Sequence, residues 1–447
     1  MAKKTKRDEF SEIEETKLTP EKEEKKNKKN KLISVIVYLQ ARYNFRFNLF
    51  AAKPEFKRVD EALEAFRFID ERIFDSLLME IKLDAGIDIN KNDFQSLINS
   101  DKLSENFNPI MDYINGLPRW DGVDRFPLFL QQIQLMDEEK RGHLINTFKR
   151  WFVMMIANLI SDTVINDTCF VLSGKQGKGK TRFLESLVPK KLRFFYSYVG
   201  TFDPHNKDHL EMIGTKMQLI LDEMETLTRT DQGTLKSTMS VKHITLRRAY
   251  GHAPIFLFRK ASFCGSINYD EFLTDTTGNR RWLPFAVSNI DVDESFDIDL
   301  LYAQAKAMFA EGFRCWFNHD EIKEIEKENE KFRRPSPEEE LIMVNYAVPT
   351  DSEVAAGTSD IKRMTSTDLM HTLASSDKYK KMNTNDTVAN RIGRTMQRMG
   401  FRQTSQRVDG KEYAVKVWLV KELSGQLGER VRRGEPLDDT AVNGLPF

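Results

Sequence analysis

A glycine-rich octapeptide, Gly174 to Thr181, constrains this chain more than any other segment. It reads G-K-Q-G-K-G-K-T, it comes after the apolar run Cys169 to Leu172, and a helix-like pattern begins at Arg182. Small residues at these positions let backbone N–H groups curl around phosphate oxygens, and the lysine at the seventh position adds a mobile cation. The pattern therefore predicts a strand, a phosphate-binding loop and a helix.

We expect this loop to bind ATP together with Mg²⁺. Lys180 would lie over the two outer phosphates, and the hydroxyl of Thr181 would be a ligand of the metal ion. An ordinary glycine-rich turn is the alternative, which the flanking strand and helix disfavour. The predicted ATP-binding residues are Gly174, Gln176, Gly177, Lys178, Gly179, Lys180 and Thr181.

Size and composition place the chain among multidomain globular proteins. Its 447 residues exceed what one hydrophobic core usually supports. The three cysteines are widely spaced, which excludes a recognisable zinc ribbon and disfavours a disulfide framework. No apolar stretch approaches the roughly 20 residues of a membrane span, and no signal-peptide core follows the basic N-terminus. We therefore expect a cytosolic protein with no membrane partner.

Composition and periodicity divide the chain into five main parts. The first residues are charged and almost devoid of apolar side chains, which is typical of a disordered tail. Short apolar strands alternate with helices in the middle of the chain, which indicates a parallel α/β sheet. The predicted parts are 1–31, a disordered tail; 32–118, a mixed or helical domain; 119–350, the phosphate-loop domain with its core at about 160–290; 362–422, a winged helix; and 423–447, a second disordered tail.

The last compact part has the order of elements of a winged helix. Helical patterns cover residues 367–373 and 386–399, Gly400 ends the second one, and two strands flank a turn at Asp409 and Gly410. Three arginines lie on one side of the second helix, where they would contact DNA. They are Arg391, Arg394 and Arg398.

Residues downstream of the loop supply the other groups that ATP hydrolysis requires. The apolar run Leu219 to Leu221 ends in two acids, so we expect Asp222 to hold Mg²⁺ and Glu223 to polarise the attacking water, with Glu225 in reserve. Unrelated acids at a surface strand end are the alternative. Asn268 ends a later strand-like run and is the expected γ-phosphate sensor, although an asparagine there is ordinarily a turn residue.

A polar turn before Trp282 presents two adjacent arginines, Arg280 and Arg281. An arginine binds a phosphoryl group through a planar fork of N–H donors. Either residue is therefore a candidate to complete the site of a neighbouring subunit, and a salt bridge within the chain is the alternative. If the arginine acts on a neighbour, the active assembly is a ring.

Two strand-like runs between His243 and Lys260 flank a Gly-His-Ala-Pro turn and predict a hairpin. Because the chain carries 68 basic and 68 acidic residues, a polyanion must be bound by local patches. In a ring, this hairpin would point into the central channel and contact DNA phosphates. An ordinary hairpin with solvated charges is the alternative. Its candidate DNA-binding residues are Arg247, Arg248, His252 and Lys260.

These motifs, in this order, resemble the virulence-associated protein E family, which are P-loop ATPases of phages, plasmids and genomic islands. The family is related to superfamily 3 helicases and D5-like replication proteins. The resemblance covers residues from about 60 to 345, and its most telling pieces are N-Y-D-E-F-L from Asn268 and T-G-N-R-R-W-L-P from Thr277. The family often has two glutamates spaced three apart in its magnesium strand; here Ile220 takes the first place and Asp222 is the replacement.

The resemblance implies an α/β fold with an AAA-like P-loop NTPase core, a helical N-terminal domain and a C-terminal winged helix. It implies an ATP-driven hexameric motor that unwinds or translocates on single-stranded or forked DNA during replication of a mobile element, beside a separate primase. Two alternatives stay open. One is an ATP-switched initiator or helicase loader that binds an origin without unwinding it, and the other is a scaffold that recruits host replication proteins.

Overall fold

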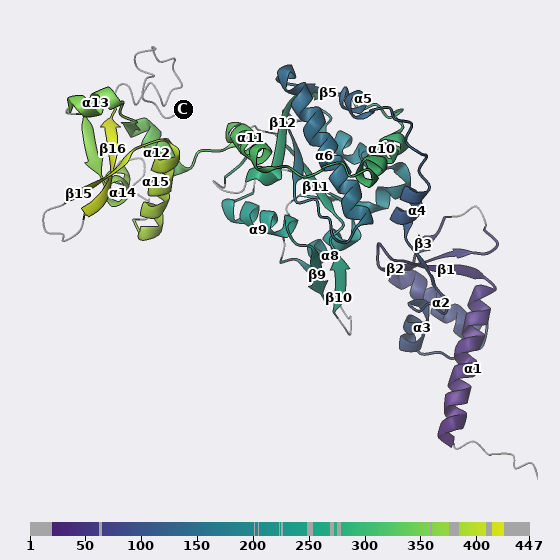
Figure 1. Cartoon of the computed structure of the whole chain (residues 1–447). Helices are drawn as coiled ribbons and strands as arrows, with labels where there is room; N and C mark the ends of the chain where they lie inside the picture. Colours follow the sequence, from purple (N-terminus) through teal and green to yellow (C-terminus); the bar gives the residue numbers. More distant parts are fainter. Residues whose placement is uncertain are drawn as a thin grey trace, which may run out of the picture. The chain divides into compact units, whose positions relative to one another are not determined.

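The computed structural model of the 447-residue chain contains two compact units, Met1–Phe332 and Arg333–Phe447, which are described separately (Figure 1). No described helix combines the length and apolar character needed to cross a bilayer. The structure describes residues 20–61, 65–200, 202–203, 205–222, 224, 227–247, 254–268, 272–274, 279–357, 360–374, 384–407 and 414–423.

The first unit begins with a small α/β module, purple to blue in Figure 1. Its four-stranded sheet has the order β3-β2-β1-β4, with β1 antiparallel to β2 and parallel to β4. Val35 and Leu39 of its first helix share a core with Phe74 and Phe94 of two later helices. The elements are α1 (Pro20–Gln40), β1 (Tyr43–Asn48), β2 (Lys53–Arg58), β3 (Arg67–Phe68), α2 (Glu71–Leu83), α3 (Lys91–Ile98) and β4 (Glu105–Phe107).

Helix α1 corrects the expected extent of the N-terminal tail. The sequence predicts disorder through residue 31, but the helix begins at Pro20; residues 1–19 lie outside the described part. Lysine and glutamate are good helix formers, and the helix is anchored at its other end, where Val35 and Leu39 are fully buried. The packing of this end stabilises the whole of α1. The helix therefore includes residues 20–31, whose composition alone predicts a disordered tail.

A six-stranded sheet lies at the centre of the first unit. Its order is β5-β12-β6-β11-β8-β7, in which β5 is antiparallel to β12 and the other five strands are parallel. Every residue of β6 and β11 is buried, as in parallel strands that are covered on both faces. The predicted α/β architecture is confirmed. The strands are β5 (Ile133–Leu135), β6 (Cys169–Ser173), β7 (Tyr196–Val199), β8 (Gln218–Leu221), β11 (Ser262–Ile267) and β12 (Trp282–Ile290).

Helices pack on this sheet and fill its core with aromatic side chains. Phe148 and Trp151 of the long helix α6 are fully buried, and their rings lie 5.1 and 5.5 Å from that of Phe170 in β6. The helical elements are α4 (Pro109–Asn115), α5 (Phe126–Leu130), η1 (Glu138–Lys140), α6 (Arg141–Ile160), α7 (Lys180–Ser186), η2 (Lys190–Phe195), α8 (Lys207–Thr215), α9 (Arg229–Met239), η4 (Asn279–Arg281), α10 (Ile298–Ala310), α11 (His319–Asn329) and η5 (Glu330–Phe332).

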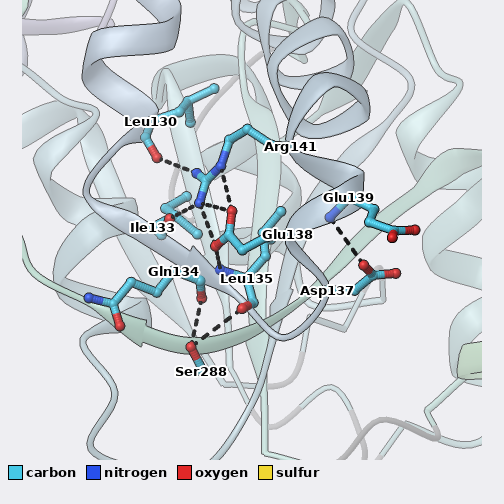
Figure 2. Close-up of polar contacts among 9 residues, drawn as sticks. All are labelled: Leu130, Ile133, Gln134, Leu135, Asp137, Glu138, Glu139, Arg141 and Ser288. Atoms are coloured by element: carbon cyan, nitrogen blue, oxygen red, sulfur yellow. Dashed lines mark hydrogen bonds and ion pairs between the residues drawn. The ribbon is translucent and has the colours of Figure 1, made fainter.

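A network centred on Arg141 fixes the edge of the sheet beside β12 (Figure 2). The guanidinium donates to the carbonyl oxygens of Leu130 at 2.9 Å and Ile133 at 2.7 Å, and it pairs with the carboxylate of Glu138 at 2.7 Å. The hydroxyl of Ser288 in β12 donates to a carbonyl oxygen of β5 at 3.2 Å. These contacts anchor β12 on the side away from β6.

A separate antiparallel pair, β9 (His243–Leu246) and β10 (Ile255–Phe258), forms the predicted hairpin between α9 and β11. Ile244 and Leu246 are buried in the core beneath it, whereas Phe256 and Phe258 are exposed. Residues 248–253, which join the two strands, lie outside the described residues.

The second unit is a small α/β domain, light green to yellow in Figure 1. Its strands β13, β14 and β15 all pair antiparallel with β16. Gly400 follows the longest of its described helices with φ +82°, the left-handed conformation that ends a helix. The elements are α12 (Pro337–Asn345), β13 (Tyr346–Ala347), α13 (Asp351–Ala356), β14 (Ile361–Met364), α14 (Ser366–Ala374), α15 (Asp386–Arg398), β15 (Gln403–Arg407) and β16 (Ala414–Glu422).

The boundary between the units lies at Phe332 and Arg333, earlier than the predicted end of the phosphate-loop domain at residue 350. Leu341, Ile342 and Tyr346 pack into the core of the second unit, which assigns α12 and β13 to it. The residues between the two predicted domains begin with helix α13, which has a capping box formed by Thr350 and Glu353. These residues therefore form a short capped helix within the second unit, and the domain boundary lies before them.

Candidate active site

The glycine-rich segment forms a loop between β6 and α7, as the sequence predicts. Residues 175–177 are exposed at its outer side. Gly174, Gly177 and Gly179 have φ values of +153°, +79° and +79°, which L-residues rarely adopt. The glycines therefore allow a backbone path that other residues would oppose.

Two of these glycines lie directly against the end of β12. A Cβ atom at Gly179 would come within 2.6 Å of the carbonyl oxygen of Ile290, and one at Gly174 would overlap the carbonyl of Val287. The N–H of Ile290 also donates to the carbonyl of Lys178 at 3.0 Å. At Gly177, by contrast, nothing lies within 4 Å of an added Cβ. The loop is thus held against a backbone on one side and open on the other.

This difference makes Gly179→Ala and Gly177→Ala a matched pair. Both substitutions incur the cost of a left-handed alanine, about 1–2 kcal/mol. Gly179→Ala also overlaps a backbone oxygen, so we expect it to lower the free energy of unfolding by roughly 1–3 kcal/mol more. Urea denaturation monitored by tryptophan fluorescence measures the difference. Equal losses for the two variants would contradict the close approach of β12.

The ammonium group of Lys180 lies folded back over the loop. Lys180 is buried, and its Nζ donates to the carbonyl oxygens of Gly174 at 2.5 Å and Lys175 at 2.9 Å. It also lies 3.4 Å from the Oδ1 of Asn268 at the end of β11. The loop lysine and the predicted sensor are therefore neighbours, because β11 is paired directly with β6.

Asp222 follows β8 and shares this end of the sheet. Its Oδ1 accepts a hydrogen bond from the hydroxyl of Ser266 at 2.5 Å, and its Oδ2 accepts one from the hydroxyl of Tyr198. Carboxyl ends of neighbouring parallel strands meet at one edge, where open α/β sheets bind ligands. Lys180, Asn268 and Asp222 thus follow the carboxyl ends of three adjacent strands, β6, β11 and β8.

Sequence reasoning missed Ser266 and Tyr198 as partners of Asp222. Ser266 lies two residues before Asn268, so a period of two along β11 could have indicated it. Tyr198 reaches the site only because β7 is parallel to β8, with Tyr198 opposite Ile220. A local sequence pattern does not reveal the order of strands in a sheet, so it could not have indicated Tyr198.

The residues present fit a magnesium nucleotide. Oxygen ligands are what Mg²⁺ prefers, and Asp222 and Thr181 are both only partly buried here. The open side of the loop at Gly177 leaves room for phosphate groups. Glu223, its reserve Glu225, and the hairpin candidates Arg248 and His252 lie outside the described residues.

The thiols in the sheet beneath the loop are not suited to nucleophilic chemistry. Cys169 and Cys264 are fully buried in β6 and β11. Burial raises the pKa of both thiols well above that of a free cysteine. Both therefore stay protonated at neutral pH and act as small apolar side chains.

The two candidate arginines after the polar turn lie in different surroundings. Arg281 donates to the hydroxyl of Ser240 from Nε at 3.1 Å and from Nη2 at 2.8 Å. Arg280 is exposed and forms no hydrogen bond or ion pair with the described residues. The structure thus distinguishes a held arginine from one that faces solvent.

The candidate DNA residues of the hairpin also separate into two groups. Arg247 is exposed directly after β9. The ammonium of Lys260 instead faces the end of α6, where it pairs with Asp162 at 2.8 Å and lies 3.1 Å from the carbonyl oxygen of Ser161. We therefore leave Lys260 out of the DNA surface, because its charge is used to cap a helix.

Aromatic side chains on the hairpin were missed when only its cations were considered. The rings of His243 and Phe256 stack at 4.7 Å, and that of Phe258 packs edge-on against Phe256 at 5.2 Å. All three side chains are exposed. The alternation of Phe256, Leu257 and Phe258 along a strand could have indicated an aromatic face on the side opposite the core.

In the second unit, two of the three arginines on α15 are paired with acids of α12. Arg391 lies 2.6 Å from Glu338, and Arg398 lies 2.5 Å from Glu339. Arg394 is exposed and has no hydrogen bond or ion pair among the described residues. Of these three arginines, Arg394 is the one whose charge is not neutralised by a described residue.

An α/β domain with a glycine-rich loop at the carboxyl edge of its parallel strands defines a broad class of proteins. Within that class, residues 114–334 match the family model of the virulence-associated protein E-like domain, and this part of the chain belongs to that family.

The chain is also similar to solved structures of the NrS-1 C-terminal region. An apo structure of the NrS-1 C-terminal region has 14% sequence identity, covers 88% of this chain and 100% of that chain, and has a TM-score of 0.46. An A-form apo structure of the same region has 14% identity, covers 88% of this chain and 99% of that chain, and has a TM-score of 0.43. No curated protein matches the sequence.

Proposed function

We propose that this protein is an ATP-driven DNA motor that acts in the replication of a mobile genetic element. The observation that carries the proposal is the meeting of Lys180, Asp222 and Asn268 beside the glycine loop. Lys180 contacts the loop carbonyls and lies 3.4 Å from Asn268. Membership of residues 114–334 in the virulence-associated protein E-like family supports the connection with mobile elements.

The strand order supports an AAA-like P-loop NTPase core. The loop follows β6, which lies between β12 and β11, and the order β12-β6-β11-β8-β7 places two strands between the loop strand and the far edge. Asp222 follows β8, the strand beside β11. A sheet of this order brings an acid and a polar amide to the side of the loop where the terminal phosphate would lie.

Each residue then has a chemical role. The loop N–H groups and Lys180 bind the phosphates, and Thr181 and Asp222 hold the metal ion, which neutralises developing charge when bound. Glu223 orients and polarises the attacking water, and Asn268 contacts the γ-phosphate. Arg280 completes the site of a neighbouring subunit, since Arg281 is held by Ser240 within its own chain. The assembly proposed is a hexameric ring.

Two surfaces would contact DNA. In the hairpin, exposed Arg247 directly follows β9, and the exposed rings of His243, Phe256 and Phe258 belong to the same two strands. This combination is suited to single strands, because bases stack on rings while phosphates pair with cations. In the second unit, the order α14, α15, β15, β16 is that of a winged helix, with α15 as its DNA-facing helix.

The motor is tested by strand separation on a forked duplex with a labelled strand. We expect wild-type protein to release the strand with ATP and Mg²⁺, and not with a non-hydrolysable analogue. ATP-dependent DNA binding without strand release would instead support the alternative, an ATP-switched initiator or helicase loader. The second unit, with an exposed Arg394 on α15 that has no ion pair among the described residues, is the feature that favours this alternative.

Arg394→Ala is expected to weaken binding of double-stranded DNA to the full-length protein about three- to tenfold, and to reduce the salt dependence by about one ion. Arg391→Ala is the matched control from the same helix. Its effect should be smaller, because Glu338 already neutralises Arg391. Fluorescence anisotropy at several salt concentrations measures both. Equal effects of the two variants, or none from Arg394→Ala, would contradict the use of this face.

A further inference from the structure

The root of the hairpin and the turn that carries Arg280 meet at one residue, Ser240. Ser240 is the C-cap of α9, and only two residues separate it from β9. Its hydroxyl accepts both hydrogen bonds from Arg281, the residue next to Arg280. A helix end that leads into the proposed DNA-binding hairpin is therefore bonded directly to the proposed trans-acting element.

A second contact joins the same two elements one turn earlier in α9. The ammonium of Lys236 donates to the Oδ1 of Asn279 at 3.0 Å, and both side chains are buried. From the opposite side, Asn329 of α11 donates to the carbonyl oxygens of Asn279 at 2.7 Å and Trp282 at 2.9 Å. The short helix η4 is thus held between α9 and α11, while Arg280 points to solvent.

The other strand of the hairpin is tied to the same end of α9. Arg259 directly follows β10, is fully buried, and donates to the carbonyl oxygens of Met239 at 2.7 Å and Asn166 at 2.5 Å. Burial lowers the pKa of Arg259 to about 10, so the side chain remains a charged donor at neutral pH. Its backbone N–H donates to the carbonyl of Lys242 at 2.9 Å. Both strands of the hairpin therefore move with the end of α9 or strain these bonds.

We propose that α9 couples DNA bound at the hairpin to the position of Arg280, with Ser240 as a positioning residue that acts through Arg281. The inference rests on the proposed motor function and adds a specific route to it. A displacement of the hairpin pulls on Ser240, Ser240 pulls on Arg281, and the adjacent Arg280 changes its place at the neighbour's site. If bound DNA changes the affinity for nucleotide through Arg280, bound nucleotide must change the affinity for DNA by the same factor, because coupling between two ligands is reciprocal.

The test measures that factor without turnover. Binding of a labelled single-stranded oligothymidine to the full-length protein is titrated with and without a non-hydrolysable ATP analogue and Mg²⁺. We expect the analogue to change DNA affinity at least about fivefold in wild type. In Ser240→Ala, this factor should fall at least about threefold, because two hydrogen bonds to a charged group are lost. DNA affinity without nucleotide should stay within about twofold of wild type.

Two further variants make the result specific. Ser237→Ala removes an exposed hydroxyl of the same helix that bonds only to the carbonyl of Thr234 among the described residues, so it should leave the coupling factor unchanged. Ser240→Thr retains the hydroxyl, so the coupling factor should remain close to that of wild type. An unchanged factor in Ser240→Ala would overturn the link through α9 while leaving the motor intact. Wild-type protein that lacks both hydrolysis and coupling would overturn the motor and the link together.

Discussion

Replacing Lys180 by alanine is expected to reduce ATP hydrolysis at least about a hundredfold, the loss that follows removal of one preorganised group from a developing charge. The ammonium of Lys180 is buried and contacts two loop carbonyls, so it is already placed where the outer phosphates would lie. Release of inorganic phosphate at saturating ATP and Mg²⁺ measures the effect.

Lys175→Ala is the matched control for Lys180→Ala. Lys175 belongs to the same loop, but its side chain is exposed and its contact with Lys180 is made by its backbone carbonyl. We expect Lys175→Ala to retain hydrolysis within about threefold, since exposed charges contribute little. A Lys180→Ala protein that is folded by circular dichroism yet hydrolyses ATP like wild type would refute the assignment of the site.

The second large effect is expected from Arg280→Ala. An arginine that stabilises the transition state of phosphoryl transfer contributes about 10³–10⁵ in kcat. Because Arg280 is exposed and its neighbour Arg281 is held by Ser240, we expect the loss to occur without disruption of the turn. ATP binding by the variant should weaken only by about the coupling factor, roughly fivefold, so most of the loss should fall on kcat.

Mixed assemblies test whether Arg280 acts on a neighbour. Arg280→Ala subunits keep Lys180, and Lys180→Ala subunits keep Arg280. In a randomly mixed ring, about a quarter of the interfaces then combine both intact residues, and hydrolysis should recover in proportion. Each variant alone should stay inactive. Intact rings that show no recovery on mixing would contradict action in trans and place Arg280 in the site of its own subunit.

Much of the central fold could be predicted because its signals are local. Three patterns can each be recognised within ten residues of sequence: the glycine loop, the apolar run of β8 with Asp222, and the run of β11 before Asn268. Parallel strands bring their carboxyl ends together by geometry, so the meeting of Lys180 and Asn268 follows from the order of the motifs.

The rest depends on packing between distant segments. Arg280 and Arg281 are equivalent in sequence, and only the hydroxyl of Ser240, 41 residues earlier, distinguishes them. The sequence predicts Lys260 as a DNA-facing cation, but its side chain pairs with Asp162. That partner comes from the loop after α6, so a local pattern around Lys260 gives no sign of it. The start of α1 at Pro20 likewise reflects anchoring by a buried segment further along the helix and not the composition of its first turns.

The most direct measurement is ATP hydrolysis by wild-type protein with and without single-stranded DNA, on samples whose mass is known from light scattering. We expect an oligomer with the mass of a ring whose hydrolysis is stimulated severalfold by DNA and lost in Lys180→Ala. A protein that binds ATP but hydrolyses it no faster with DNA, in any assembly state, would contradict the motor.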